Sequence, residues 1–381
     1  MGGGRRLSLG GVLRRNGMTP PDYRRTERRK AEEHRIRLGA PPPSGRPRTS
    51  WPARPRRALR IGIGIGINTR RDLQDFPAMS AQEPGPRYLS RQYVKLCERP
   101  DFEDPEFLAV LREIAPGHSP TEELHRKYWE YAMLGLFLQE VGALRDDATA
   151  LSVAAGHEAP LYWMANKIAR MVATDIYGHG SFSAREADSS MLTDPASFAP
   201  YAYRRDHLEV RDMNALHLDF PDASFDIVFS LSSIEHFGGP RAAAEAAREM
   251  SRVLRPGGHL VITTECLVAS HILDWPPLQL AIRMATLGRR CGHSTLRRRV
   301  VDAFTPHEIE RYIVLPTGLE LVQPLDVRIS ADSYDNVLRW SEDGSLTQSA
   351  TGEQWPHIML KGHGAPWTSA FLALRKQADV E

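Results

Sequence analysis

From about residue 148 onward, short apolar runs alternate along the chain with stretches that have the spacing of amphipathic helices. Runs rich in β-branched and other apolar residues predict buried strands, because residues in a parallel sheet are covered on both faces. The predicted strands are ATALSVA (148–154), ARMVATD (169–175), LEVRDM (208–213), FDIVFS (225–230) and HLVITTE (259–265). This alternation predicts an α/β fold, a doubly wound domain around a mainly parallel sheet.

Helix boundaries are marked between and after these strands. APLYWMANKIA (159–169) and the strongly amphipathic PRAAAEAAREMSRVL (240–254) predict helices, and Pro256-Gly257-Gly258 predicts the end of the second one. Thr305-Pro306-His307-Glu308 has the residues of a capping box and predicts a helix through residue 314. LELVQPLDVRIS (319–330) and WTSAFLALRK (367–376) predict two final strands.

Helical spacing also precedes the α/β region. RYLSRQYVKLCERP (87–100) and DPEFLAVLREI (104–114) both place apolar residues at helical intervals. Ser119-Pro120-Thr121-Glu122 resembles a further capping box, from which a helix is expected to run through residues 128–144. We therefore expect an N-terminal helical cap over residues 86–145, followed by the α/β domain at residues 146–377.

Residues 1–60 have a different composition from the rest of the chain. They contain 17 basic and four acidic residues, a formal charge of about +13, and few large apolar residues. Such a segment cannot bury enough surface to offset its ordering entropy, so we expect an Arg/Pro-rich disordered leader. Two hypotheses for it stay open, namely a basic arm that binds RNA, DNA or an acidic membrane, or a leader without function upstream of a start at Met79.

The remaining residues carry a formal charge of −11, and their composition limits the possible partners. A mildly acidic surface disfavours nucleic acid as a partner of the folded domain. The three cysteines, Cys97, Cys266 and Cys291, are far apart and form no CxxC pair, which suits a reducing cytoplasm. No apolar run approaches the roughly 20 residues that span a bilayer. We expect a cytoplasmic protein without a membrane span; the oligomeric state cannot be predicted.

The loop after the first predicted strand, LSVAAGHEAP (151–160), lies where open α/β sheets bind ligands. Asp175 ends the second strand, and a carboxylate there can accept hydrogen bonds from both hydroxyls of a ribose. The loop lacks the glycines of G-x-G-x-x-G, which a pyrophosphate requires for close approach of the backbone. RIGIGIGIN (60–68) also lacks the third glycine of that pattern and a following helix. These features indicate a nucleoside ligand and disfavour an NAD-type dehydrogenase.

Together these segments resemble the class I S-adenosylmethionine-dependent methyltransferases, in particular the small-molecule methyltransferase domains. LSVAAGHE occupies the position of the family's first motif, and Asp175 that of its ribose-binding acid. DMNALHLDFPDASFDIVFSLSSIEHF (212–237) and REMSRVLRPGGHLVITTE (248–265) match the later motifs with the correct spacing. The resemblance covers residues 130–265 and extends more loosely to the C-terminus. It implies S-adenosyl-L-methionine as cofactor and a Rossmann-like seven-stranded sheet with an antiparallel last strand.

The resemblance also implies which residues contact the cofactor, at the ends of four strands. They are Ser152, Val153, Ala154, Ala155, Gly156, His157 and Glu158 in the first motif, Asp175 and Ile176, then Met213, Asn214 and Ala215 near the adenine, and Ser230 and Leu231. Four residues depart from the family pattern: Ser152 and Asn214 replace acids, and Ala154 and Glu158 replace glycines. These departures keep a second hypothesis open, a catalytically degenerate binding or scaffold protein.

Methyl transfer requires proximity and orientation, and a base when the acceptor is a hydroxyl. We expect His236 to be that base, because an imidazole titrates near neutral pH. Glu235 is expected to orient it or to line the acceptor site; alternatively, both residues only cap the following helix. Some relatives have a metal-binding Glu-x-x-Glu-His sequence here, but Ser232 stands at its first position, so no metal is expected.

Two insertions, residues 177–205 and 267–301, are expected to form the acceptor side. The second contains ILDWPPLQLAIRMATL (272–287) and five arginines, Arg289, Arg290, Arg297, Arg298 and Arg299. It is either a lid whose arginines meet phosphate or carboxylate, or a solvated helix that packs on the sheet. Asp274, Trp275 and Trp355 are candidate pocket residues. The predicted function is O-methylation of a small molecule, such as a saccharide or another secondary metabolite.

Overall fold

The computed structural model describes residues 89–378 except for 119–122, 181–185, 271–272, 274, 288–296, 298–301, 336, 341–345, 349–354 and 363–364. The predicted leader, Met79 and RIGIGIGIN lie outside the described residues. So do the predicted capping box at 119–122, Asp274, Cys291 and four of the five arginines of the second insertion.

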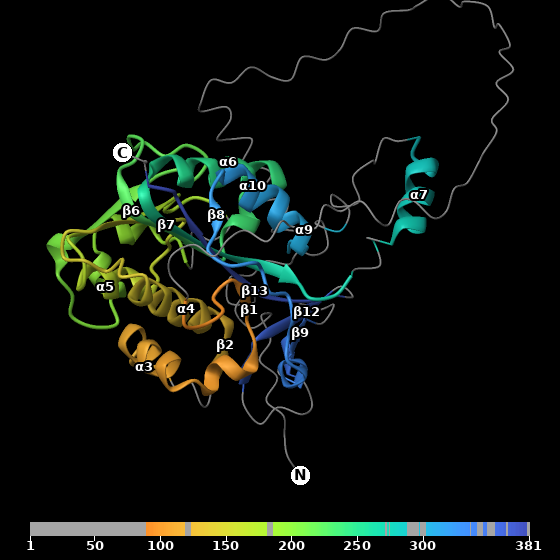
Figure 1. The fold of residues 1–381 in the computed structure, drawn as a ribbon, viewed down its shortest axis with the longest axis horizontal. Coiled ribbons are helices and arrows are strands. Elements are labelled where there is room, and N and C mark those ends of the chain that lie inside the picture. The colour runs from red at the N-terminus through yellow and green to blue at the C-terminus, as the bar shows by residue number, and fades with distance from the viewer. Residues whose placement is uncertain are drawn as a thin grey trace, which may run out of the picture. The chain divides into compact units, whose positions relative to one another are not determined.

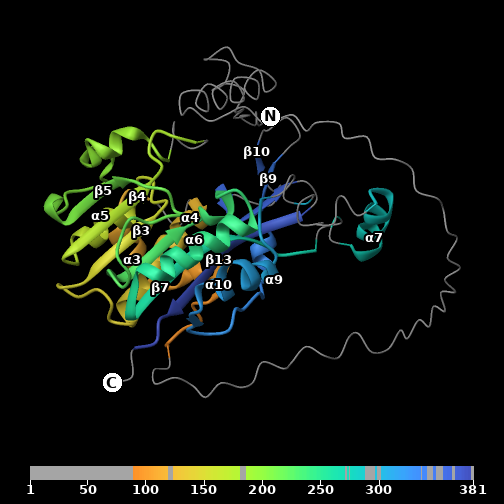
Figure 2. The ribbon, with the colours of Figure 1, turned by 90° about the horizontal axis from the view of Figure 1, so that it is seen from above.

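Five parallel strands form the centre of the sheet, in the order β5-β4-β3-β6-β7 (Figures 1 and 2). They are β3 (Thr149–Val153), β4 (Arg170–Asp175), β5 (Leu208–Asp212), β6 (Phe225–Leu231) and β7 (Leu254–Leu267). Almost every residue of β3 and β6 is buried, as expected for strands covered on both faces. The five predicted strands are confirmed.

The long strand β13 (Ala365–Arg375) closes this arrangement. It runs antiparallel to β7, with Trp367 opposite Leu267 and Arg375 opposite His259. β8 (Glu320–Leu321) pairs with the last residues of β13. The predicted seven-stranded sheet with an antiparallel last strand is therefore confirmed, although only two residues of LELVQPLDVRIS pair as a strand.

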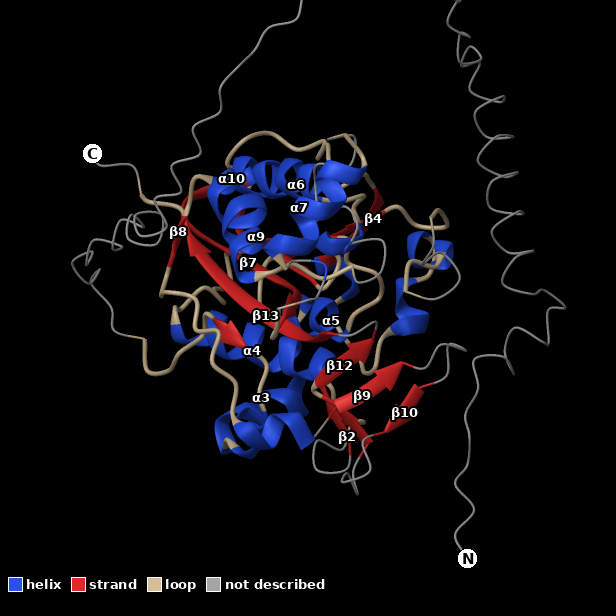
Figure 3. Cartoon of the chain, turned by 90° about the vertical axis from the view of Figure 1, so that its right-hand side faces the viewer, coloured by secondary structure: helices blue, strands red, loops and turns tan. Residues whose placement is uncertain are grey.

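The sheet extends beyond the seven predicted strands. Because β8 covers only the end of β13, the first half of β13 keeps an edge that pairs with β1 (Lys95–Leu96) and β12 (Met359–Gly362). β9 (Val337–Trp340) and β10 (Leu346–Gln348) continue from β12 (Figure 3). β11 (Trp355–His357) and β2 (Glu123–His125) form a separate parallel pair.

Helices cover both faces of the sheet (Figures 1 and 3). One face carries α3 (Pro105–Ile114), α4 (Arg126–Glu140) and α5 (Ala159–Ala165). The other carries α6 (Pro240–Val253), α9 (Pro306–Ile309) and α10 (Leu315–Thr317), the last two joined by a π-helical turn, η7 (Glu310–Val314). The capping box of Thr305 and Glu308 is confirmed, with each side chain bonded to the other's backbone N–H. No described helix is long and apolar enough to cross a membrane.

Shorter helices complete the described chain. The remaining α-helix, α7 (Pro276–Ala285), lies in the second insertion. The 3-10 helices are η1 (Arg99–Glu103), η2 (Ser189–Leu192), η3 (Pro195–Phe198), η4 (Arg205–His207), η5 (Ile234–His236) and η8 (Ala331–Asp335).

One of the helices predicted before the α/β domain is wrong, and another is largely confirmed. The helix predicted at 87–100 is absent from its described part, which is extended through β1 and then enters η1. Tyr93, Val94, Leu96 and Cys97 are all buried there because sheet and loop contacts enclose the strand on both sides. The helix predicted through residues 128–144 is present as α4, which begins at Arg126 with His125 as its N-cap, after β2, and ends at Glu140.

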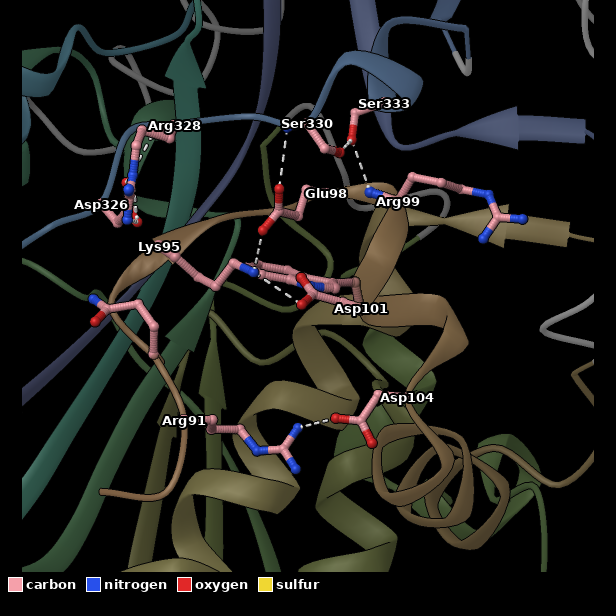
Figure 4. A network of polar contacts seen from close by, with 12 residues as sticks. Arg91, Lys95, Glu98, Arg99, Asp101, Asp104, Asp326, Arg328, Ser330 and Ser333 are labelled. Carbon is pink, nitrogen blue, oxygen red and sulfur yellow. Dashed lines mark hydrogen bonds and ion pairs between the residues drawn. The ribbon is translucent and has the colours of Figure 1, made fainter. Parts of the chain in front are cut away.

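A network of polar contacts joins residues 89–103 to the C-terminal part of the chain (Figure 4). Lys95 pairs with Glu98 at 2.5 Å and with Asp101 at 2.9 Å. Glu98 also accepts a hydrogen bond from the backbone N–H of Ser330, and the hydroxyl of Ser333 accepts one from Arg99. Residues 89–103 are thus part of the sheet's surroundings rather than a separate helical cap.

Candidate functional site

The predicted cofactor residues meet at one edge of the sheet. β3, β4, β5 and β6 are parallel, so their carboxyl ends face the same side. In the register of these strands, Val153 lies opposite Thr174, and Asp175 lies opposite Asp212. The loop 154–158, Asp175, the segment 213–215 and the end of β6 are therefore brought together, as in other doubly wound sheets that bind ligands at this edge.

Asp175 is the charged centre of this edge. Its carboxylate accepts hydrogen bonds from the backbone N–H of Gly156 at 2.9 Å and from its own neighbour, Ile176, at 2.7 Å. Burial raises the pKa of Asp175 above its ordinary value, while these two bonds oppose that shift. A carboxylate has about four acceptor positions, so two remain for donors such as the hydroxyls of a ribose.

At two positions of the first-motif loop, the backbone has a positive φ, a conformation that glycine adopts most readily. Ala154 has φ of 55° and Gly156 has φ of 51°. A Cβ at Gly156 would lie 2.7 Å from the backbone oxygen of Glu186, so this position requires glycine. Ala154 holds the same region of φ with a side chain, which costs roughly 1 kcal/mol.

The first insertion lies against the cofactor loop, and this differs from the acceptor-side position expected for it. The hydroxyl of Tyr177 donates to the backbone oxygen of Gly156 at 2.8 Å. The rings of His157 and Phe198 stack with their centroids 4.8 Å apart. His157 thus supports the loop through its ring, which no pattern in the loop itself indicated.

The residues predicted to lie near the adenine and at the strand ends differ in exposure. Asn214 is exposed, and its side-chain oxygen already accepts from the N–H of Leu216 at 2.9 Å, which leaves one acceptor position on that oxygen. Ile176 is 43% exposed, as a residue that covers a ligand would be. Ser230 is completely buried, and its hydroxyl has no hydrogen-bond partner in the described part of the chain.

Lys127, which the sequence did not single out, joins the cofactor loop to α4. Its ammonium group contacts the carboxylate of Glu158, donates to the backbone oxygen of Leu231 at 2.8 Å and lies 3.3 Å from Glu130. Burial raises the pKa of Glu158 to about 7, although Lys127 opposes the shift. Glu158, which stands where the family pattern has glycine, is therefore one half of a partly buried ion pair.

Glu130 lies fully buried on α4, in the middle of an apolar run. The hydroxyls of Ser232 and Ser369 each donate to it at 2.5 Å. Burial opposes its ionisation, yet Lys127 and Arg126 hold the pKa of Glu130 below its ordinary value. A charged residue inside YWEYAMLGLF was the available sequence signal for this cluster.

Arg126, one turn before Glu130, extends the cluster to β7. Its guanidinium pairs with Glu265 at 2.6 Å and donates to the hydroxyl of Ser369 at 3.1 Å. α4 thus delivers three charged side chains to the carboxyl ends of β6 and β7.

His236 and Glu235 lie at the end of η5, directly after β6. Nδ1 of His236 is 3.2 Å from Oδ2 of Asp302, a residue that the sequence did not single out. Burial lowers the pKa of His236, but the hydrogen bond with Asp302 and the charges of Glu235, Glu265 and Asp302 together raise the pKa overall. The prediction that these residues cap the following helix is wrong: α6 has Gly239 as its N-cap, without a side-chain cap.

Glu235 is only 1% exposed, and the hydroxyl of Thr264 donates to its Oε2 at 2.8 Å. Burial, and then the charge of Glu265, raise the pKa of Glu235 to about 7, while His236 opposes the shift. Among the described residues, no group of three or more His, Cys, Asp or Glu side chains is arranged to hold a metal ion.

In its described part, the second insertion matches neither the expected anion-binding arginines nor the expected helix packed on the sheet. Arg297 is buried, donates to the backbone oxygen of Ala303 and pairs with Glu308, so it is engaged within the protein rather than by an acceptor anion. On α7, Leu280 and Met284 are 58% and 69% exposed, so this helix does not pack its apolar side chains on the sheet. Trp275, at the N-cap of α7, is 55% exposed. For Trp355, only its backbone position in β11 is described.

A surface hollow of about 430 Å³ lies elsewhere, lined by Gln139, Gly142, Leu144, Asp146, Asn166 and Lys167. These residues precede β3 and β4, so the hollow lies at the amino ends of the strands. It is separate from the candidate site, where the titratable groups gather.

Comparison with known proteins agrees with this geometry. Residues 151–262 match a family described as "Methyltransferase domain". Over 57 residues, the chain is 42% identical to 27-O-demethylrifamycin SV methyltransferase of Amycolatopsis mediterranei, covering 15% of this chain and 20% of that protein. Over 98 residues, it is 43% identical to the probable tRNA methyltransferase 9B of Bos taurus, covering 22% of each chain.

A longer match is to methyltransferase GfsG of Streptomyces halstedii, which is 28% identical over 222 residues, with 54% of this chain and 69% of that protein covered. The two more identical matches span only about a fifth of those relatives' lengths.

Proposed function

We propose that the protein is a class I S-adenosylmethionine-dependent methyltransferase that methylates a hydroxyl group of a small molecule, such as a saccharide or another secondary metabolite. Its residues 151–262 match a family described as "Methyltransferase domain". The observation that carries this proposal is the position of Asp175, half-buried at the end of β4 with two acceptor positions left beside the first-motif loop. Similarity to an O-demethylrifamycin methyltransferase supports oxygen as the acceptor atom.

The cofactor is held by the edge of the sheet in this proposal. Asp175 accepts hydrogen bonds from the ribose hydroxyls. Ile176 and the segment 213–215 flank the adenine, and the loop 152–158 contacts the rest of the cofactor. Ser230 supplies a buried hydroxyl that lacks a partner in the described part of the chain. When bound, S-adenosylmethionine supplies a methyl group already activated by its sulfonium.

His236 takes the proton of the acceptor hydroxyl in this proposal. The acceptor oxygen forms its bond to the methyl carbon as the carbon–sulfur bond breaks, and the hydroxyl proton passes to the imidazole. Asp302 holds Nδ1 at 3.2 Å, which presents Nε2 to the acceptor and stabilises the imidazolium that results. Lys127 keeps the loop and α4 together through Glu158.

We further propose a cytoplasmic location, because the described cysteines, Cys97 and Cys266, are buried free thiols. A leader at residues 1–60 and a domain over residues 146–377 with two insertions remain our proposed organisation. The alternative to catalysis, a degenerate scaffold, has one observation in its favour: Ala154 carries a side chain where the loop needs positive φ.

Thermal unfolding with and without ligand separates these functions. We expect S-adenosylmethionine and S-adenosylhomocysteine to raise the melting temperature and NADH to leave it unchanged, since a ligand at 100 times its Kd adds about 2.7 kcal/mol. Mass spectrometry should then find products heavier by about one methylene after incubation with metabolites. Binding without any product would support the scaffold, and no shift with the two adenosyl ligands would refute cofactor binding.

A further inference from the structure

Ser232 has an unusual backbone conformation directly after β6. Its φ is 48°, a left-handed value that glycine adopts readily and that strains a residue with a side chain. Its backbone N–H donates to Thr263 on β7, to the hydroxyl at 2.9 Å and to the backbone oxygen at 3.0 Å. The turn at Ser232 also begins the segment that leads to the proposed base, His236.

Ser233 connects this turn to the first-motif loop. Its hydroxyl lies 3.2 Å from the backbone oxygens of Ala154 and Leu231, within hydrogen-bond distance of both. Ala154 also has a left-handed φ, of 55°. Two strained positions, one after β3 and one after β6, are thus linked through Ser233 at the edge where we expect the cofactor. Strained residues gather at ligand sites, where the surrounding structure has to hold them in place.

Glu130, on α4, holds the side chain of Ser232. The hydroxyl of Ser232 donates to Oε1 of Glu130 at 2.5 Å, and the hydroxyl of Ser369 on β13 donates to the same oxygen at 2.5 Å. Glu130 is completely buried, with Lys127 at 3.3 Å and Arg126 at 3.7 Å. A hydrogen bond from a hydroxyl to a carboxylate is short and strong, so it opposes the backbone strain of Ser232.

Lys127 holds the residue before Ser232. Its ammonium group donates to the backbone oxygen of Leu231 at 2.8 Å and contacts Glu158, at the other end of the first-motif loop. Because Lys127 and Glu130 are three positions apart on α4, they reach the same turn from one face of the helix. The chain is therefore held by α4 on both sides of the peptide bond between Leu231 and Ser232.

Stability alone does not account for a carboxylate at position 130. Apolar side chains of similar volume can often replace a buried ion pair without loss of stability, because burial of the charges costs about as much as their attraction gains. Residues 131–138, which follow Glu130 on α4, are all buried and largely apolar. A charged group retained in such surroundings indicates that one particular conformation is required.

We infer that Glu130 is a positioning residue for the cofactor: through the hydroxyl of Ser232, it holds the turn after β6 in the left-handed conformation that keeps Ser233 against Ala154. The cofactor then meets a preformed site, and its apparent affinity follows the fraction of molecules that have this conformation. Glu130 acts through Ser232 and Ser233 rather than by touching the cofactor. The inference rests on the proposed function.

Two substitutions of Ser232 separate the conformation of the turn from the loss of a hydrogen bond. Ser232→Ala and Ser232→Gly both lose the hydroxyl, but only glycine adopts the left-handed φ without strain. By isothermal titration of the full-length protein, the affinity for S-adenosylhomocysteine should fall about 5-fold or more in Ser232→Ala and by less in Ser232→Gly. The inference is wrong if the alanine variant binds at least as tightly as the glycine variant, or if both bind like the unmodified protein.

Ser251→Ala is the matched control. The hydroxyl of Ser251, on α6, is also buried and donates to the backbone oxygen of Thr317 at 2.7 Å. Ser251 precedes the first residue of β7 by three positions, so it lies at the opposite edge of the sheet. Its substitution should destabilise the protein in urea denaturation and leave the affinity for S-adenosylhomocysteine unchanged. A loss of affinity equal to that of Ser232→Ala would show that general destabilisation is the cause.

A double variant then assigns the effect to Glu130. Glu130→Gln removes the charge that the hydroxyl of Ser232 contacts, so it should lower the affinity for S-adenosylhomocysteine in the unmodified chain and lower it less when Ser232 is already alanine. Equal losses in the two backgrounds would show that Glu130 does not act through Ser232. No binding by the unmodified protein would instead refute the proposed function itself.

Discussion

Nδ1 of His236 lies 3.2 Å from Oδ2 of Asp302, and 66 residues of chain separate the two. This contact raises the pKa of the imidazole against the effect of its burial. It also determines how the proposed base responds to pH, because only the neutral imidazole accepts a proton.

We predict that kcat/KM rises with pH and levels off above the raised pKa of His236. Asp302→Asn should move the midpoint of this profile to lower pH, since the stabilising charge is lost, and His236→Ala should lower kcat by about 100-fold or more. Asp206→Asn, at a carboxylate that is 85% exposed, is the control. A profile in which Asp302→Asn leaves the midpoint unchanged would remove Asp302 from the account.

Lys127 should contribute strongly to stability, because its removal leaves Glu158 and Glu130 buried without their common cation. We expect Lys127→Met to lower the free energy of unfolding at pH 8 by about 3 kcal/mol in urea denaturation. Adding Glu158→Gln should recover part of the loss, because one uncompensated charge is then gone. If the double variant is less stable than Lys127→Met, the ion pair is not the cause.

Ala154 gives a test of backbone strain in the first-motif loop. At φ of 55°, Ala154→Gly relieves strain of roughly 1 kcal/mol, which offsets the greater freedom of glycine in the unfolded chain. The melting temperature should therefore stay the same or rise. Ala242→Gly, inside α6, should instead cost about 1 kcal/mol. Equal losses in the two variants would contradict the strained loop.

Glu235 should make stability depend on pH between about 4.5 and 7. Its pKa is about 7 in the folded protein and ordinary when unfolded, so the folded state binds more protons in this range. The free energy of unfolding contributed by this group therefore falls as pH rises through the range, by about 3 kcal/mol in all. Glu235→Gln should flatten this part of the curve in urea denaturation at several pH values. A curve identical to that of the unmodified protein would show that Glu235 is not the titrating group.

Much of the fold could be predicted because its signals are local. β3 and β6 are covered on both faces, so their sequences are apolar throughout, and Thr305 and Glu308 form a capping box within four residues. β1, β2 and the strands from β9 to β12 are short and exist only through partners such as β13, far away in sequence. No local pattern distinguishes such strands from loops.

The site residues likewise divide into those that a local pattern predicted and those that depend on distant segments. Asp175 was predictable because it follows a buried strand at a fixed distance from the first-motif loop. Lys127 and Asp302 were not, because their partners Glu158 and His236 come from other segments of the chain. Arg297 was predicted to meet an anionic group of the acceptor because it belongs to a run of arginines. That run gave no indication of its contact with Glu308.

Cofactor binding at Asp175 is the claim on which the account depends most, and isothermal titration with S-adenosylmethionine tests it most directly. We predict one site per chain in the unmodified protein and an affinity at least about 10-fold lower in Asp175→Ala, because the acceptors for the ribose hydroxyls are lost. Asp206→Asn should bind like the unmodified protein. No heat of binding at millimolar cofactor, or an unchanged affinity in Asp175→Ala, would contradict it.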